Sequence, residues 1–230
     1  MDLLPVDTTF DARDHGATVA LLPVGSFEQH GPHLPLTTDT LVASTIALEL
    51  ATVYPVFRLP PLTISCSHEH AAWAGTVSIS ATTLAAVVRD VATSVARAGA
   101  STLVLVNGHG GNYVLGNVVQ EASLDPFRMA LFPTEPDWDD ARAEAGLSTT
   151  GLSDMHAGEL ETSILLHAFP DLVRPGYERA DHLADDRRYL LSRGMQAYTE
   201  SGVVGRPSLA SAEKGRAVLA SLVRSFAGHL

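Results

Sequence analysis

The chain has 230 residues, of which 46% are hydrophobic and 18% charged, so it holds enough apolar material for the core of one large domain. Its 15 basic and 26 acidic residues give a net charge of -11, which argues against a nucleic-acid binder or a protein that docks on an anionic membrane. Cys66 is the single cysteine, and neither a signal peptide nor a membrane-spanning apolar run is evident, so we expect a soluble cytoplasmic protein.

Short apolar runs alternate with longer helical segments, a pattern typical of a mainly parallel sheet with helices on both faces. In chain order, we expect a strand over 17–24, a helix over 40–53, a strand over 55–62, a helix over 80–100, a strand over 101–106, a helix over 112–122, a strand over 127–132 and a helix over 156–169. One or two further helices follow residue 185, and the prolines of 55–62 favour an edge strand.

The helix over 80–100 has the clearest boundaries, because Ser80 or Thr82 can cap its start and Gly99 can end it. Residues 133–154 are polar and irregular, so we expect a lid or variable loop there. No internal repeat or linker is evident. The chain 1–230 is therefore predicted to form one layered α/β/α domain.

Side chains that can bind a metal follow two of the predicted strands. Glu28 and His30 come just after 17–24, and His109 comes just after 101–106. Because sites in open α/β sheets form outside the carboxyl ends of the strands, we expect these side chains to meet at one rim. Together with Asp39 they offer nitrogen and oxygen ligands, which suit zinc, manganese or iron.

Simpler interpretations remain open for two residues of this segment. The stretch TTDT has the composition of a helix start, so Thr37, Thr38 or Asp39 could cap the helix over 40–53. His33 lies between two prolines, where a histidine is more typical of a solvated loop than of a metal site.

The motif NGHGGN (107–112) is neither a Walker A loop nor GxGxxG, so it gives little support to phosphate binding. Glycines around His109 permit positive φ angles and close backbone approach. We expect a tight turn that holds His109 toward a pocket, with the backbone N–H groups of Gly110, Gly111 and Asn112 near a ligand.

The segment HAGELETS supplies His156, Glu159 and Glu161. In a regular helix Glu159 would lie moderately close to His156, whereas Glu161 would face away. His156 and Glu161 can both reach one site only if the helix begins after Gly158 and His156 lies in the preceding loop. The alternative is a capped helix whose first-turn acids interact with the helix dipole.

A second histidine-rich segment, SHEHAAWAGT (67–76), contains His68, Glu69, His70 and Trp73. It does not match HExxH, and both a substrate-pocket wall and an ordinary loop are consistent with it. Nucleophilic catalysis has little support, because Ser26 lies in no GxSxG motif and Cys66 has no activating neighbour in sequence. We expect structural or solvated roles for the remaining histidines: His15, His167, His182 and His229.

Five blocks resemble, in order, the signature segments of the creatininase family: LLPVGSFEQHGPHLPLTTDT, SHEHAAWAGTVSIS, LVLVNGHGGN, HAGELETS and SGVVGRPSLASAEKG. The resemblance implies a layered α/β fold, metal-dependent hydrolysis of C–N bonds and a homo-oligomer, in many members a hexamer. It also implies one or two Zn, Mn or Fe ions, with Glu28, His30, Asp39 and His109 as ligands and Asp39 bridging two ions.

The chain departs from creatininase proper at two positions. That enzyme has a ligand glutamate two residues after the glycine-loop histidine, where this chain has Gly111, so a glutamate from elsewhere is expected. Glu161 matches the ETS glutamate of the family, and Glu159 is the second candidate. The acidic residue before the histidine matching His156 is replaced by Met155. Both changes argue against creatinine and favour the members with HGGN and HAG, which include the mycofactocin precursor peptide peptidase and a formamide hydrolase.

Residues and resemblance together predict an amidohydrolase in which metal-activated water attacks a small amide, lactam or formamide. His156 is the candidate acid and base, with Glu159 beside it, and the backbone N–H groups of 108–112 could bind the oxyanion. His70 and Trp73 are expected to shape the substrate pocket. A metallopeptidase that trims a short peptide tail would need an open groove instead. A non-catalytic binding protein on the same scaffold is the third alternative.

Overall fold

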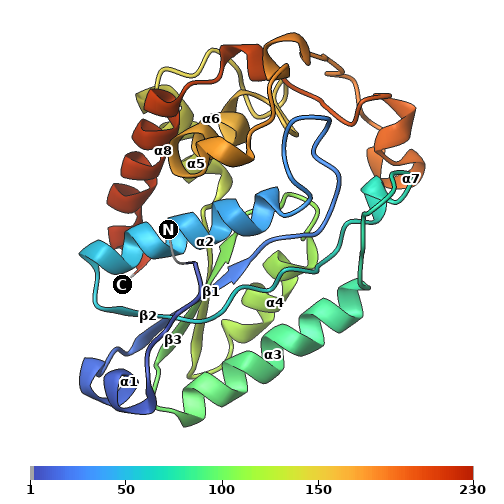
Figure 1. Ribbon diagram of the computed structural model, residues 1–230. Coiled ribbons are helices and arrows are strands. Elements are labelled where there is room, and N and C mark those ends of the chain that lie inside the picture. Colours follow the sequence, from blue (N-terminus) through green and yellow to red (C-terminus); the bar gives the residue numbers. More distant parts are fainter. Residues whose placement is uncertain (1–2, 230) are drawn as a thin grey trace.

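The computed structural model describes residues 3–229. Its four strands form one parallel sheet in the order β2-β1-β3-β4 (Figure 1). The strands are β1 (Val19–Val24), β2 (Val56–Arg58), β3 (Thr102–Asn107) and β4 (Arg128–Phe132). Val24 and Asn107 are register partners at the last residues of β1 and β3, so the two central strands end level with each other.

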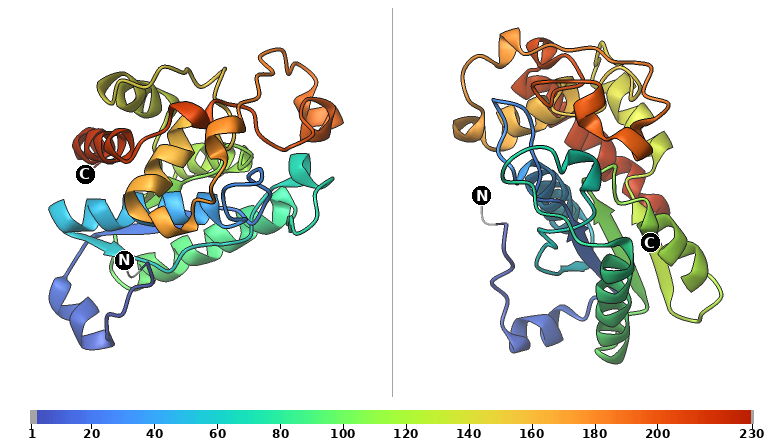
Figure 2. Two further views of the ribbon diagram at one scale, coloured as in Figure 1. Left: turned by 45° about the horizontal axis from the view of Figure 1, so that its top comes forward. Right: turned by 90° about the vertical axis from the view of Figure 1, so that its right-hand side faces the viewer.

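Helices cover both faces of the sheet, which confirms the predicted α/β class (Figure 2). They are α1 (Thr9–His15), α2 (Thr38–Val53), α3 (Ala81–Arg97), α4 (Val114–Ala122), α5 (Glu135–Glu144), α6 (Glu159–Ala168), α7 (Leu190–Arg193) and α8 (Ala212–Ser225). α3 and α4 pack on one face, whereas α2, α6 and α8 pack on the other, with α5 against α8.

Each central strand contributes alternate side chains to two separate apolar cores. Leu21 of β1 and Val104 of β3 face the core under α2, α6 and α8. Leu22 and Leu105, one residue further along, face the core under α3 and α4. Because side chains alternate across a strand, burial on both faces requires a continuous apolar run. This is why the sequence predicts these two strands so clearly.

The expectation of an irregular segment over 133–154 is wrong for its first half, where α5 forms. Thr134 and Asp137 make a capping box that starts α5, and Ala141 packs in the core. Most side chains of α5 are charged, so its apolar residues are too few to give a helical hydrophobic pattern in the sequence. α1 was also not expected; it starts with a capping box between Thr8 and Asp11.

Two other elements are shorter than the sequence predicts, because local residues end them early. The strand expected over 55–62 is limited to Val56–Arg58 at the edge of the sheet, since prolines interrupt the rest. The helix expected over 80–100 runs from Ala81 to Arg97; the Ser80 hydroxyl accepts from Thr83 N–H, and Gly99 has a φ of +103°. Among residues 3–229, no helix is both long and apolar enough to cross a bilayer.

Candidate metal centre

Metal-binding side chains from four segments meet outside the carboxyl ends of β1 and β3. The segments are the loop after β1, the first turn of α2, the glycine loop after β3 and the start of α6. Three groups each hold ligand atoms within 4.8 Å of one another: Glu28, Asp39 and His109; His30, Asp39 and Glu161; and Glu28, His30 and His156. The structure thus brings together all five residues that the sequence suggested as ligands, together with His156.

Asp39 lies at the middle of this cluster and is shared by two of the groups. Its Oδ1 is 3.0 Å from His30 Nε2, and its Oδ2 is 3.0 Å from His109 Nδ1. The Ser26 hydroxyl donates to Oδ2 at 2.6 Å. The alternative in which Asp39 caps α2 is wrong, because the residue sits inside the first turn and its carboxylate is used by these partners. Its two oxygens face two different imidazoles.

Three imidazoles of the cluster are each oriented by a main-chain carbonyl. His30 Nδ1 donates to Glu28 O at 3.1 Å, His109 Nε2 to Cys66 O at 2.8 Å, and His156 Nε2 to Gln29 O at 2.6 Å. A carbonyl can only accept, so the nitrogen that faces it carries a proton. The other nitrogen of each ring is left to offer a lone pair, as in histidines that bind metals.

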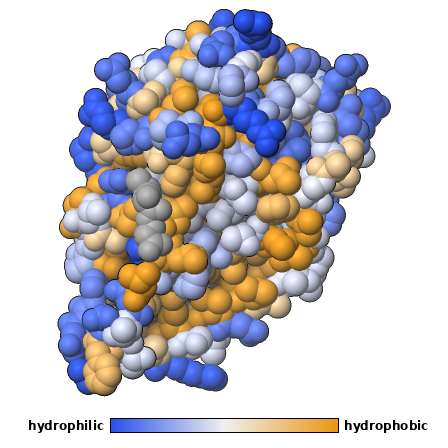
Figure 3. All heavy atoms as spheres, viewed as in Figure 1, coloured by the Kyte–Doolittle hydropathy of each residue, from blue (hydrophilic) through white to orange (hydrophobic). Residues whose placement is uncertain are grey.

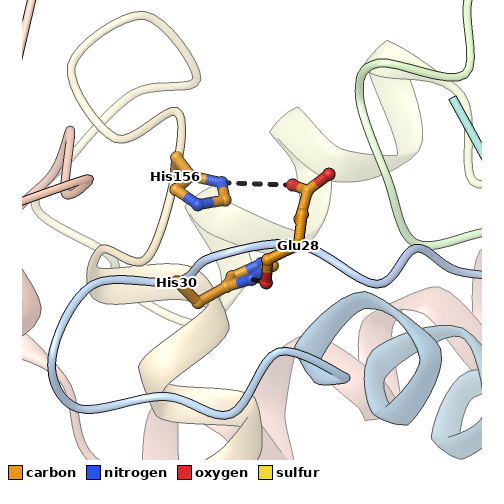
Figure 4. A group of neighbouring side chains, drawn as sticks. All are labelled: Glu28, His30 and His156. Carbon is orange, nitrogen blue, oxygen red and sulfur yellow. Dashed lines mark hydrogen bonds and ion pairs between the residues drawn. The ribbon is translucent and has the colours of Figure 1, made fainter. Parts of the chain in front are cut away.

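The Glu28 carboxylate shows most clearly that a cation fits here. It is fully buried, and neither oxygen has a hydrogen-bond partner among the described residues. His109 Nε2 and His70 Nε2 approach its oxygens at 3.2 and 3.3 Å, and His156 Nδ1 faces it at 3.7 Å (Figure 4). Burial raises the pKa of Glu28 to about 8. A buried acceptor without a donor is rare in folded proteins and calls for an explanation such as an ion.

Protons occupy part of the cation's place in the metal-free protein. Burial opposes protonation of His109, but the carboxylates of Glu28 and Asp39 outweigh it and raise its pKa to about 10. Burial also opposes protonation of His30, but the Asp39 carboxylate outweighs it and raises the pKa of His30 to about 9. Burial would raise the pKa of Asp39, yet these two imidazoles hold it below its usual range.

The start of α6 places His156 and Glu161 on the same side. The helix begins at Glu159 rather than at 156, so His156 lies in the preceding loop. Ala157 has a φ of +53°, and its N–H donates to Glu161 Oε2 at 2.5 Å. This break in the helical path meets the condition under which His156 and Glu161 share one site. Glu161 Oε1 lies 3.9 Å from His30 Nε2.

Two buried residues from outside the motifs hold that helix start. Asp154 accepts from the backbone N–H groups of Glu159 at 2.5 Å and Leu160 at 3.0 Å, which caps α6. Arg142 of α5 donates to Asp154 at 3.0 Å and thereby ties the pocket wall to the cap. The sequence separation of Asp154 from the helix concealed this role.

Glu159 is not brought into the cluster. Its carboxylate accepts from Ser148 N–H, from Thr149 N–H and hydroxyl, and from Lys214 Nζ at 2.5 Å. These partners lie on the side of α6 that faces α8 and the loop after α5. The fully buried carboxylate therefore links three segments of the fold instead of facing the other ligands.

The glycine loop uses close approach rather than unusual backbone angles. Gly108, Gly110 and Gly111 do not adopt positive φ, contrary to one expectation from the sequence. A Cβ at Gly108 would lie 2.3 Å from Asp39 O, so the loop presses directly against the start of α2. Asn112 fixes the turn, because its side chain accepts from Cys66 N–H at 3.2 Å and donates to Asn107 Oδ1 at 3.0 Å.

A layer of polar groups supports the cluster from behind. The Gln29 amide donates to His70 Nδ1 at 2.8 Å and to Gly202 O at 3.1 Å. His70 is buried next to Glu28, and burial lowers the pKa of His70 to about 3. His33 is also buried, with Nε2 at 3.2 Å from the Thr162 hydroxyl, so the interpretation as a solvated loop histidine is wrong.

Two pockets flank the glycine loop and share Tyr113. The larger has a volume of about 840 Å³ and is lined by residues that include His109, Gly110, Glu161, Trp138 and Arg142. The smaller, about 410 Å³, includes Glu69, Gly111 and Arg193. Trp73 and His70 line neither pocket. Trp138 of α5 is instead the indole in the wall of the larger one, a role that the missed helix had hidden.

Comparison with known proteins agrees with this geometry. The creatininase family model, described as creatinine amidohydrolase, matches residues 7–230. The mycofactocin precursor peptide peptidase of Mycobacterium ulcerans (strain Agy99) is 38% identical over 215 residues, which cover 88% of this chain and 80% of the relative. The creatinine amidohydrolase of Pseudomonas putida is 28% identical over 177 residues, covering 69% and 67%.

A solved structure extends the likeness to the whole fold. The manganese form of creatininase superposes with a TM-score of 0.83 at 26% identity, covering 100% of this chain and 97% of the other. The family model, the curated relatives and the buried ligand groups point to one class of hydrolase. The chain belongs to the creatininase family and is a metal-dependent amidohydrolase.

Proposed function

We propose that this amidohydrolase cleaves a peptide C–N bond near the end of a short peptide, using one or two divalent ions of zinc, manganese or iron. The observation that carries the metal assignment is the fully buried Glu28 carboxylate, which has imidazoles around it but forms no hydrogen bond of normal geometry with the described residues. The residues that would hold the ions are Glu28, His30, Asp39, His109 and Glu161. Nitrogen and carboxylate donors of this kind suit those metals.

A bound ion would supply Lewis acidity, which activates water at neutral pH and polarises an amide carbonyl. The chain's own part is to position groups and to move a proton. His156 Nδ1 is free to accept, because Nε2–H is fixed on Gln29 O. As the water oxygen bonds to the carbonyl carbon, its proton passes to Nδ1, and from there to the nitrogen that departs when the C–N bond breaks.

The glycine loop is suited to the oxyanion that develops in this reaction. Gly110 lines the larger pocket and Gly111 the smaller, so these two glycines lie where the pockets adjoin, and we propose that their backbone N–H groups serve as the donors. The N–H of Asn112 has a long contact of 3.4 Å with His109 O. Preorganised backbone donors are an effective way to stabilise such a charge.

Two observations favour a peptide over a small lactam. Four of the curated relatives that match are mycofactocin precursor peptide peptidases, at 34% to 38% identity. Pockets of about 840 and 410 Å³ on the two sides of Tyr113 offer room for residues on both sides of a scissile bond. A peptidase needs an open arrangement of this kind, whereas an enzyme that acts on a small molecule can use a closed pocket.

The test uses the purified protein loaded in turn with Zn²⁺, Mn²⁺ and Fe²⁺. Its substrates are short peptides with apolar or aromatic ends, creatinine and formamides, and products are followed by mass spectrometry. We expect peptide cleavage that His109→Ala and Glu28→Gln abolish. The exposed His167→Ala and Glu121→Gln serve as matched controls with unchanged rates. Turnover of creatinine but not of peptides would contradict the peptide assignment.

We also infer a homo-oligomer. Apolar side chains gather over α2 and the β2 edge of the sheet on the face shown in Figure 3. Val6, Phe10 and Val53 are exposed by 79%, 67% and 60%. Extended exposed apolar areas commonly mark subunit contacts. Light scattering coupled to size exclusion would test this, with a monomer at micromolar concentration as the contradicting result.

A further inference from the structure

The backbone angles of Gly111 do not explain why this residue is a glycine. Its φ lies outside the left-handed region, so any residue could adopt this conformation. The restriction is one of space: a Cβ at position 111 would lie 2.0 Å from Glu69 Oε1, 2.4 Å from His109 Nε2 and 3.0 Å from Cys66 O. The carboxylate of Glu69 thus fills the volume in front of Gly111.

The position of Glu69 is fixed by contacts between its own segment and the glycine loop. Glu69 lies in the short 3-10 helix His68–His70, three residues after Cys66. Cys66 is attached twice to the glycine loop, since its N–H donates to Asn112 Oδ1 at 3.2 Å and its carbonyl accepts from His109 Nε2 at 2.8 Å. A residue so close to two such contacts has little freedom to move away.

The carboxylate also faces the ring that would bind an ion. Glu69 Oε1 is 3.6 Å from His109 Nε2, while the other nitrogen, Nδ1, faces Asp39 at 3.0 Å. The side chain is only 15% exposed and lies at the wall of the smaller pocket. The Nε2–H is donated to Cys66 O at 2.8 Å, so Glu69 acts on the ring through its charge, and a negative charge behind a ligand histidine strengthens the donor nitrogen on the other side of the ring.

We propose that Glu69 is a positioning residue of the metal centre: it orients His109 from behind and adds a negative charge beside the ion, in space that exists because residue 111 has no side chain. The inference rests on the proposed metal function of the cluster. It explains how a segment from before α3 compensates for the absence of an acidic side chain in the glycine loop. For this role the Glu69 carboxylate does not need to touch the substrate.

The first experiment measures metal binding without any substrate. Zn²⁺ and Mn²⁺ affinities are determined by chelator competition and the number of ions by mass spectrometry, for the wild type, Glu69→Gln and the surface control Glu121→Gln. We expect Glu69→Gln to bind about 10- to 100-fold more weakly, as for other groups behind metal ligands. The melting temperature of its metal-free form should equal that of the wild type, and the control should be unchanged in both respects.

The outcomes separate the inference from the proposed function. A wild type that binds no divalent ion would refute the metal function itself. If Glu69→Gln binds metal as tightly as the wild type, only the role of Glu69 is refuted. If it also loses hydrolysis at that unchanged metal affinity, Glu69 acts on the substrate instead of on the metal centre. If Glu69→Gln lowers both the melting temperature of the metal-free protein and the metal affinity, Glu69 has a purely structural role, which would also refute the inference.

A double-mutant cycle tests the link between the two positions. Gly111→Ala puts a Cβ against both Glu69 and His109, so it should weaken metal binding in the wild-type background. In the Glu69→Ala background the carboxylate is gone and the contacts with His109 and with Cys66 O remain, so the same substitution should cost less affinity. The contributions of these two remaining contacts cancel in the cycle. Additive effects of Glu69→Ala and Gly111→Ala would overturn the proposed coupling.

Discussion

Replacing Glu28 by glutamine keeps the shape of the side chain and removes its charge, and in the metal-free protein we expect this change to stabilise the fold. Burial raises the pKa of Glu28 from 4.5 to about 8. At pH 7 the group is ionised in the unfolded chain and largely protonated in the folded one. At 1.36 kcal/mol per pH unit, the folded state loses about 3 kcal/mol through this difference.

The sign of the pH dependence follows from the raised pKa. The contribution of Glu28 to stability is fully present below its unfolded pKa of 4.5 and is lost as the pH rises toward its folded pKa of about 8. The advantage of Glu28→Gln should therefore be near zero at pH 4.5 and largest above pH 8. The figure of about 3 kcal/mol is an upper value for pH 7, since the amide also needs hydrogen-bond partners.

Thermal unfolding with a chelator at pH 5, 7 and 8.5 measures the effect. For a chain of this size, about 3 kcal/mol corresponds to a rise in Tm of about 6 to 12 °C. With Zn²⁺ or Mn²⁺ in place of the chelator the order should reverse, because the wild type gains stability from ion binding and the variant does not. A variant less stable than the wild type at every pH without metal would refute the reasoning.

Three further predictions concern neighbouring groups. His30 and His109, with pKa values raised to about 9 and about 10, must lose protons when an ion binds. Metal affinity should rise from pH 6 to 9, with about three protons released near pH 7, because Glu28, with a pKa raised to about 8, must lose its proton as well. Calorimetry in buffers of different ionisation enthalpy measures this release, and equal heats in all buffers would contradict it. Glu161→Gln should reduce the number of bound ions measured by mass spectrometry. Glu159→Gln should leave that number unchanged but lower stability by about 2 kcal/mol, because it removes the charge of a buried carboxylate that binds the partly exposed Lys214; equal ion loss in both variants would be inconsistent with the structure. Asp154→Asn should lower the urea midpoint and also kcat, because it weakens the cap of α6 beside His156, the residue that we propose as acid and base. An unaltered kcat would show that the cap does not position that residue.

The sheet and the main residues of the candidate metal centre were accessible from the sequence for a physical reason. Strands buried on both faces must be apolar throughout, so β1 and β3 stand out as continuous runs. The residues that follow them are then placed at one rim by the parallel topology alone. Glu28, His30 and His109 follow these two strands directly, and their position needs no knowledge of distant contacts.

The remaining features depend on contacts between distant segments. The start of α6 is set by Asp154, which lies outside the helix, and by the positive φ of Ala157, so helical periodicity could not locate it. α5 is held by a narrow apolar side against α8. The placement of Glu69 against Gly111 joins positions 42 residues apart, and no local pattern in either segment predicts it.

The three ligand-side imidazoles take their orientation from carbonyls of Glu28, Cys66 and Gln29, that is, from the main chain. A point mutation at those three positions changes a side chain but leaves the carbonyl in place. Apart from the influence of Glu69 that we propose for His109, the orientation of the rings is therefore insulated from much of the substitution that a gene accumulates. The walls supplied by α5 and Tyr113 have no such protection. A fold built in this way can exchange one substrate for another while its chemistry stays the same.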